Sequence, residues 1–296
     1  MKRLWITIDT EMDADIHWKK HWPPTYTSII DGIPNMLRPI WDEFDAHPIY
    51  FVSPEVLYSD ECCEVLSNEI SKGAIIGAHL HPEYIEPVKI WGKEIEGVEP
   101  QFPCYAYSTD IEREKIKNLT RLIEEKLNVS PEWYRAARFG ADTDTINILR
   151  ELGYKYDSSV TPYIDWSLKG GPNHSQGNIK PYIVAEHNIY TENNNNNNGL
   201  IEMPVTIRGN RWGALGKIFP DNWLFYRWLR PTHMTCLELS ALINEIAEEE
   251  NIVMMFHSME IMINKTPYVR NRGMQNYYLF RLRKSLEKAK KKGFSL

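Results

Sequence analysis

Cysteine is scarce in this sequence, and a basic excess and long apolar runs are absent. The 296 residues include four cysteines, and two of them, Cys62 and Cys63, are adjacent. Adjacent cysteines suit neither a simple disulfide framework nor a Cys-x-x-Cys metal site, so we expect a reduced, cytoplasmic protein. The N-terminal stretch MKRLWITIDTEMD becomes acidic before any apolar region develops. It therefore predicts neither a signal peptide nor a membrane-spanning segment.

The charge balance excludes one class of partner. The formal net charge is −6 and the isoelectric point is near 5.9, whereas proteins that bind a nucleic-acid backbone usually have a basic surface. The basic run at 288–292 is typical of the solvated face of a last helix. Hydrophobic residues make up 43% of the chain, which is enough for a sizeable core. We expect one domain over residues 1–296 and no nucleic-acid partner.

Short apolar runs alternate with longer amphipathic runs along the chain. The predicted strands cover 4–9, 48–53, 74–81, 132–139, 154–160, 200–207 and 252–257. The predicted helices cover 28–44, 59–72, 109–127, 143–152, 235–250 and 275–292. This alternation is typical of an α/β fold with a parallel sheet and crossover helices. Seven strands predict a closed or nearly closed barrel, with an open doubly wound sheet as the alternative, and the asparagine run at 193–198 predicts a mobile loop tip.

Two histidines separated by one residue are the most informative pair in the sequence. His79 and His81 end an apolar strand, where alternate side chains point to the same face, so both imidazoles are expected to leave it together. Two imidazoles and a carboxylate can hold a divalent metal. Asp9 and Glu11 supply carboxylates at the end of the first predicted strand, and either one can ligate if both share a face.

Further polar side chains end other predicted strands. Arg135 and Arg138 close the fourth strand, and His257, followed by Glu260, closes the seventh. Active sites of parallel α/β folds gather where the carboxyl ends of the strands meet, so these residues are expected to converge. Taken singly, each has a plainer interpretation: a surface cation, a turn residue or an ordinary polar strand end. Their coincidence at equivalent strand ends favours a site.

These segments together resemble the polysaccharide deacetylase family, the metal-dependent carbohydrate esterases of family 4 with NodB homology. Residues 7–11 (TIDTE) stand where the family has Thr-Phe-Asp-Asp-Gly, and residues 76–82 (IGAHLHP) stand where it has His-x-x-x-His. Residues 134–140 (YRAARFG) match its arginine motif, and residues 254–258 (MMFHS) match its last histidine motif. The motifs match in the family's order from residue 4 to about 260. The sequence most resembles the divergent branch of the family that is associated with O-antigen and other surface-polysaccharide pathways.

The resemblance implies a fold and an activity. The implied fold is a distorted seven-stranded (β/α) barrel, and the implied activity is hydrolysis of an N-acyl group, chiefly N-acetyl, from an amino sugar. The implied metal ligands are Glu11, His79 and His81. Histidine and carboxylate ligands suit Zn2+, while nickel, cobalt, manganese and iron remain open. The substrate can equally be a nucleotide sugar, a lipid-linked glycan or a finished polysaccharide.

The resemblance also implies roles for the other strand-end residues. Asp9 is expected to be the general base, kept ionised by Arg135 or Arg138. His257 is expected to be the general acid, oriented by Asp157. The expected substrate contacts are Trp166 and Glu260.

Two departures from the family pattern keep other functions open. Thr10 replaces the usual second aspartate, with Glu11 as the nearest substitute, and the His-x-His spacing does not fit a helical turn as His-x-x-x-His does. One alternative is a catalytically silent carbohydrate-binding relative. Independently of these departures, an N-deformylase of a 4-formamido sugar is also open, because formyl and acetyl differ in the size of pocket they need and the sequence does not settle that size.

Overall fold

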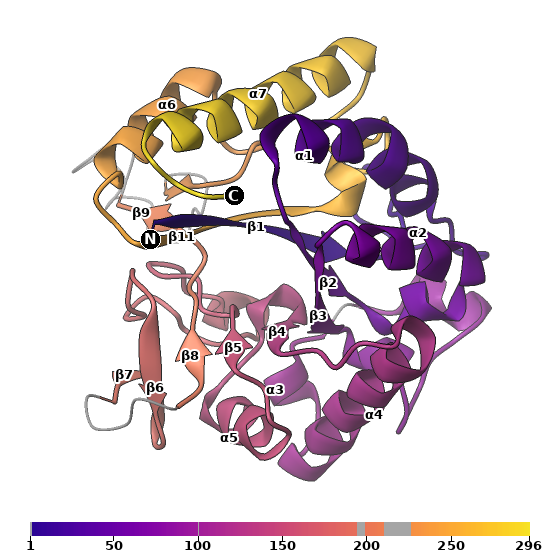
Figure 1. The fold of residues 1–296 in the computed structure, drawn as a ribbon. Helices are drawn as coiled ribbons and strands as arrows, with labels where there is room; N and C mark the ends of the chain where they lie inside the picture. Colours follow the sequence, from indigo (N-terminus) through magenta and orange to yellow (C-terminus); the bar gives the residue numbers. More distant parts are fainter. Residues whose placement is uncertain (1, 100, 194–198, 210–225) are drawn as a thin grey trace.

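A curled, nine-stranded sheet forms the centre of the fold (Figure 1), in a computed structural model that describes all residues except 1, 100, 194–198 and 210–225. The strand order is β11-β1-β2-β3-β4-β5-β8-β6-β7. Its strands are β1 Arg3–Thr10, β2 Ile49–Val52, β3 Ile75–Leu80, β4 Trp133–Ala136, β5 Tyr156–Asp157, β6 Tyr182–Ala185, β7 Asn188–Glu192, β8 Ile201–Glu202 and β11 Asn251–His257. A separate antiparallel pair consists of β9 Ile207–Arg208 and β10 Arg227–Trp228. The loop tip predicted at 193–198 lies, but for its first residue, outside the described residues.

The seven predicted strands are the seven parallel strands of the sheet. Strands β11, β1, β2, β3, β4, β5 and β8 pair in parallel, and β6 and β7 add an antiparallel hairpin at the β8 edge. The curl brings the chain after β8 back to β11, where the Thr206 amide donates to the Val253 carbonyl at 3.0 Å. The predicted α/β barrel class is therefore confirmed, and the strands missed from the sequence are β6, β7, β9 and β10.

Helices surround the curled sheet, with α6, α7 and α1 on one side and α3, α4 and α5 on the other (Figure 1). The α-helices are α1 Arg38–Phe44, α2 Asp60–Ser71, α3 Pro103–Ala106, α4 Thr109–Leu127, α5 Thr143–Glu151, α6 Cys236–Glu245 and α7 Arg272–Lys291. The predicted helix 28–44 divides into a π-helical segment, Ser28–Leu37, and α1. Short 3-10 turns include Pro82–Tyr84, Ala137–Phe139 and Ser258–Ile261, each within two residues of the end of a strand of the sheet. No described helix is both long and apolar enough to cross a membrane.

Alternation along β1 explains how the fold positions polar side chains. Leu4, Ile6 and Ile8 belong to the large core that the helices cover. The residues between them point into the barrel, where Trp5 packs in a second apolar cluster with Ile49, Phe51, Trp133 and Val253. Further along the same face the side chains become polar, since Thr7 and Asp9 follow Trp5 at intervals of two. The barrel interior is thus apolar at one end and polar at the carboxyl ends of its strands.

Candidate metal and catalytic site

The carboxyl ends of four parallel strands bring the predicted residues together. In the strand register, Asp9 of β1 is opposite His257 of β11, and His79 of β3 is opposite Arg135 of β4. Glu11 and His81 follow directly after β1 and β3 (residues 10 and 80 end those strands). Residues far apart in sequence therefore meet, because each is the last inward-facing side chain at the carboxyl end of its strand.

Glu11, His79 and His81 form a compact set of possible metal ligands. One ligand atom from each lies within 4.8 Å of the others, and all three side chains are buried. Glu11 Oε1 is 3.4 Å from His79 Nε2 and 3.3 Å from His81 Nε2. Among the described residues, this is the group of histidine, cysteine and carboxylate side chains that meets a metal-site geometry.

The outer nitrogen of each imidazole is already engaged. His79 Nδ1 lies 2.9 Å from the Arg135 carbonyl oxygen, and His81 Nδ1 lies 3.1 Å from Glu83 Oε1. Because a carbonyl and a carboxylate only accept, both Nδ1 atoms carry a proton, and each Nε2 is the nitrogen on the Glu11 side that could ligate a cation once deprotonated. His81 Nε2 is buried without a hydrogen-bond partner. Buried lone pairs fixed by outer acceptors are the usual setting of a histidine metal ligand, so the residues present fit a divalent cation.

Lys20 shares the Glu11 carboxylate. Its Nζ lies 3.0 Å from Glu11 Oε2 and donates to the Met12 carbonyl at 2.6 Å. Burial by itself would raise the pKa of Glu11, but Lys20 and the imidazoles of His79 and His81 outweigh burial and hold that pKa well below its usual range. Glu11 is therefore an anion, with one oxygen toward the imidazoles and the other toward Lys20.

Asp9 is held by Arg135 and lies apart from the ligand set. Arg135 Nη1 donates to Asp9 Oδ1 at 2.6 Å, and the guanidinium also donates to Thr7 Oγ1 and to the carbonyl and hydroxyl of Ser158. Burial opposes ionisation of Asp9, yet Arg135 and the nearby imidazoles outweigh it, so the pKa of Asp9 is lowered. Of the two predicted arginine partners, the structure pairs Arg135 with Asp9.

Glu260 orients His257, which differs from both sequence predictions about these residues. Glu260 Oε1 is 2.9 Å from His257 Nδ1 and accepts from the His257 amide, also at 2.9 Å. Arg230 pairs with the same carboxylate, and Thr232 Oγ1 donates to it at 2.7 Å. Glu260 is fully buried, so it is not placed to touch a substrate. His257 Nε2 faces the site, 3.6 Å from Glu11 Oε1 and 3.9 Å from Asp9 Oδ2.

Asp157 lies in β5, within the predicted strand 154–160, but its partners are not His257. Its Oδ1 accepts from Ser159 Oγ at 2.6 Å, and its carboxyl group pairs with that of Glu202 on the neighbouring strand β8. The prediction that Asp157 orients His257 is therefore wrong. Thr10 also points away from the ligand set, because its hydroxyl donates to the Ile8 carbonyl at 3.0 Å.

A cavity of about 350 Å3 opens over these residues. Predicted residues on its wall are Asp9, Glu11, His79, His81, Arg138, Trp166 and His257. Aromatic rings and further cationic side chains line the rest, and Trp166 stacks on Phe139 with 6.1 Å between ring centroids. The cavity thus has a charged floor and an aromatic wall, which suits the apolar face and the hydroxyl groups of a sugar.

Three residues of the site were missed from the sequence. Glu83 follows His81 at a spacing of two, a signal that the alternation of an extended chain could have given. Lys20 lies in a loop and Arg230 follows the short strand β10. Neither has a periodic pattern that singles it out before the fold is known.

Comparisons with known proteins identify the fold. No protein-family model matches the sequence, and no curated protein matches it. A Mycobacterium smegmatis protein described as a polysaccharide deacetylase aligns with a TM-score of 0.53 and 17% identity, over 97% of this chain and 85% of that one. The polysaccharide deacetylase Bc1974 from Bacillus cereus aligns with a TM-score of 0.47 and 13% identity, over 100% of this chain and 90% of that one. The predicted resemblance to polysaccharide deacetylases is confirmed at the level of the fold.

A further structural match shows how far the fold alone reaches. The 4-alpha-glucanotransferase from Thermococcus litoralis aligns with a TM-score of 0.52 and 13% identity, over 97% of this chain but only 38% of that one. Proteins described with different activities thus share this architecture, so function has to be argued from the site.

Proposed function

We propose that this protein is a metal-dependent hydrolase that removes an N-acyl group from an amino sugar used in surface-polysaccharide or O-antigen biosynthesis. The observation that carries the proposal is the meeting of three sets of residues at one edge of the sheet. These are the Glu11, His79 and His81 set, the Asp9–Arg135 pair and the His257–Glu260 pair. Amide hydrolysis needs an activated water, a stabilised oxyanion and a proton for the departing amine, and the three sets match these needs.

Glu11, His79 and His81 are the residues that would hold the cation, with Zn2+ the first choice for this donor set. A divalent cation supplies polarisation of the acyl oxygen and acidifies water. Glu83 and the Arg135 carbonyl keep the imidazoles oriented through their Nδ1 protons.

Asp9 is the proposed general base. Arg135 donates to Asp9 Oδ1, which leaves Oδ2 free of that bond and turned toward His257 Nε2 at 3.9 Å. The ion pair keeps the carboxylate charged, and a charged, oriented carboxylate is ready to take a proton from water. Asp9 is nearly buried, so bulk water competes little for this position.

His257 is the proposed general acid. Its Nδ1 proton is held by the Glu260 carboxylate, so its Nε2 is the nitrogen that presents a proton to the leaving amine. Arg230 and Thr232 fix the Glu260 carboxylate in turn, so the orientation of the His257 ring is held from behind. Base and acid thus face the same space from adjacent strands, β1 and β11.

The test is to incubate metal-loaded protein with N-acetylated and N-formylated amino sugars and to measure free acetate and formate. Acetate release identifies a deacetylase, and release of formate alone identifies the N-deformylase alternative. Release of neither, from free, nucleotide-linked and polymeric sugars alike, would contradict the hydrolase proposal.

One observation favours a second candidate, a carbohydrate-binding protein without catalysis. Lys20 occupies the second oxygen of the Glu11 carboxylate, and a cation there competes electrostatically with a divalent metal. Sugar binding that persists in metal-free protein, together with no acyl release, would support this candidate against the hydrolase.

A further inference from the structure

Cationic side chains in the site cavity fall into two groups. Lys20 pairs with Glu11, and Arg230 pairs with Glu260. Arg138 and Lys169 line the same cavity but form no ion pair and no side-chain hydrogen bond with any described residue. The carboxylates Asp9 and Glu11 are already neutralised by other cations. The cavity therefore holds two positive charges that its own described residues do not compensate.

Arg138 is held in an unfavourable state. Its Nε is buried without a hydrogen-bond partner, and burial lowers the pKa of the guanidinium although Glu83 and Glu99 act to raise it. Its φ is +55°, and that of Phe139 is +62°, in the left-handed region that costs a side chain free energy. Strain and an unpaired buried donor together are expected where a ligand completes the structure.

The orientation of Arg138 leaves its polar edge available. Its guanidinium carbon lies 4.7 Å from the centre of the Phe102 ring, so one face of the planar group packs on an aromatic side chain. A stacked guanidinium keeps its N–H groups in the plane, where a carboxylate or phosphoryl group can accept two of them.

Lys169 adds a second charge on the aromatic wall. Its Nζ lies 5.3 Å from the centre of the Trp166 ring, and Trp166 in turn stacks on Phe139, the neighbour of Arg138. Lys169 is exposed, so its charge is available at the mouth of the cavity. Both cations are thus linked to the wall that a sugar ring would contact.

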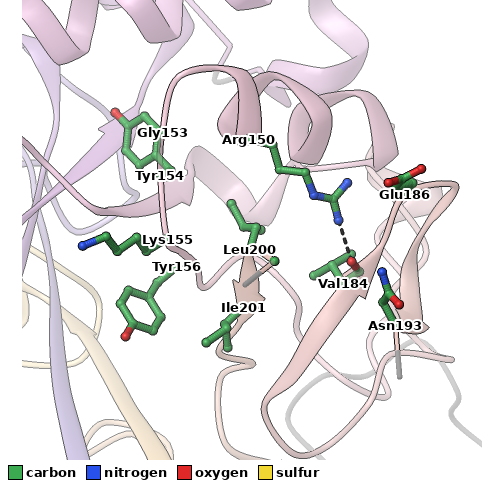
Figure 2. A pocket seen from close by; sticks show the side chains of 11 residues that line it. Arg150, Gly153, Tyr154, Lys155, Tyr156, Val184, Glu186, Asn193, Leu200 and Ile201 are labelled. Atoms are coloured by element: carbon green, nitrogen blue, oxygen red, sulfur yellow. Dashed lines mark hydrogen bonds between the residues drawn. The ribbon is translucent and has the colours of Figure 1, made fainter. Parts of the chain in front are cut away.

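A second cavity, away from the site, lacks such free cations (Figure 2). It has a volume of about 600 Å3 and lies around the start of β5 and β8, with Arg150 and Lys155 on its wall. Arg150 donates to the Val184 carbonyl at 2.6 Å, and Lys155 pairs with Glu132. Arg150 is thus hydrogen-bonded and Lys155 ion-paired, whereas Arg138 and Lys169 have neither kind of partner among the described residues.

We propose that the substrate is an acylated amino sugar that also bears an oxyanion, a phosphoryl or carboxylate group, and that Arg138 and Lys169 bind this group. The inference rests on the proposed function, because it assigns the substrate class of the same site. It also gives Arg138 a binding role in place of the predicted pairing with Asp9.

The test compares three acylated sugars that differ in charge. N-acetylglucosamine, its 1-phosphate and the corresponding uronic acid are assayed for acetate release by the metal-loaded protein. We expect the wild type to favour at least one anionic sugar over the neutral one by about 10- to 100-fold in kcat/KM, the range of one charge-assisted bidentate contact. The preferred anion distinguishes a phosphoryl from a carboxylate source.

The variants assign that preference to residues. In Arg138→Gln the preference for the anionic sugar should fall toward unity through a higher KM, and Lys169→Gln, at an exposed position, should weaken it without affecting folding. Lys155→Gln removes the same charge far from the site and should leave the preference unchanged. A preference that survives in both Arg138→Gln and Lys169→Gln would overturn the assignment.

Binding without turnover separates this inference from the proposed function. Calorimetry with glucosamine 1-phosphate and glucosamine measures the anion contribution in the absence of any acyl group. If no sugar releases acetate but the phosphate strengthens binding in an Arg138-dependent way, the function fails and the anion site stands. If neutral and anionic sugars are bound and turned over equally well, the anion site is overturned and the proposed function stands. If no sugar is bound or turned over, both proposals are contradicted.

Discussion

Arg135 Nη1 lies 2.6 Å from Asp9 Oδ1, and both side chains are buried at the carboxyl edge of the sheet. The pair connects β4 to β1 across the barrel interior, since the two strands are separated by β2 and β3 in the sheet. An ion pair in this place fixes the direction of the Asp9 carboxylate as well as its charge.

Asp9→Asn tests the role of this carboxylate as a base. The amide oxygen can still accept from Arg135, so we expect a folded protein with its metal retained. Turnover should fall by about 10²- to 10⁴-fold, the usual contribution of a positioned acid or base. The measurements are acetate release and metal content of the same preparation. Loss of metal together with activity would make Asp9 a ligand instead.

Glu260→Gln tests how His257 is oriented. The variant removes the charge next to Nδ1 and allows the imidazole to adopt the other tautomer, so kcat should fall by about 10-fold or more. Asp157→Asn is the matched control, because Asp157 contacts Ser159 and Glu202 and no contact joins it to His257. Full activity in Glu260→Gln with a loss in Asp157→Asn would restore the sequence prediction.

Gly77→Ala tests the packing beneath Arg135. A Cβ at residue 77 would lie 2.6 Å from Phe51 Cδ1, and the Phe51 ring packs against the Arg135 guanidinium at 4.3 Å. We expect a loss of about 1–3 kcal/mol in the free energy of unfolding from overpacking, measured by denaturant titration. Gly97→Ala, where an added Cβ meets nothing within 4 Å, should change it little. Equal stability of both variants would show that Phe51 moves freely.

Glu112 predicts a pH dependence of stability outside the site. Burial raises its pKa to about 7, although a hydrogen bond from Thr145 Oγ1 acts against the rise. Between about pH 4.5 and 7 the folded state therefore binds more protons than the unfolded state, and this group makes the protein less stable as pH rises through that window. Glu112→Gln should remove up to about 3 kcal/mol of this loss.

The comparison for Glu112 is thermal unfolding at pH 4 and pH 8. Glu112→Gln should match the wild type at pH 4 and exceed its Tm at pH 8. Glu114→Gln, an exposed position on the same helix α4, should show no such difference. A variant Glu112→Gln that is no more stable than the wild type at pH 8 would contradict a raised pKa.

The parallel strands, and the convergence of polar residues at their carboxyl ends, could be predicted from the sequence. The alternation of apolar and polar residues along each strand indicates both. Alternation directs Asp9, His79 and Arg135 into the barrel, and parallel pairing aligns them. The hairpin of β6 and β7 was missed because it lies in a polar, proline- and glycine-containing stretch with little alternation. Its pairing with β8 is a long-range contact that local pattern does not record.

Which side chains pair with one another was harder to predict from the sequence than where each residue lies in the fold. The sequence leaves Arg135 and Arg138 equivalent, but the strand ends at Ala136, Arg138 follows in a left-handed turn, and its side chain lines the cavity instead of pairing with Asp9. Likewise, Glu260 was expected at a substrate and instead holds His257 in a single turn after β11. Side-chain direction after a strand end depends on the turn, and no sequence period encodes it.

The most direct test of the account is the amount of Zn2+ bound by metal-stripped protein after titration, measured by elemental analysis. The wild type should bind one ion per chain, and His79→Ala, His81→Ala and Glu11→Ala should each lose most of it. His21→Ala, an exposed histidine that pairs with Asp15, should bind as the wild type does. Wild-type occupancy in all three ligand variants, or no binding by the wild type, would contradict the central claim that these residues form a metal site.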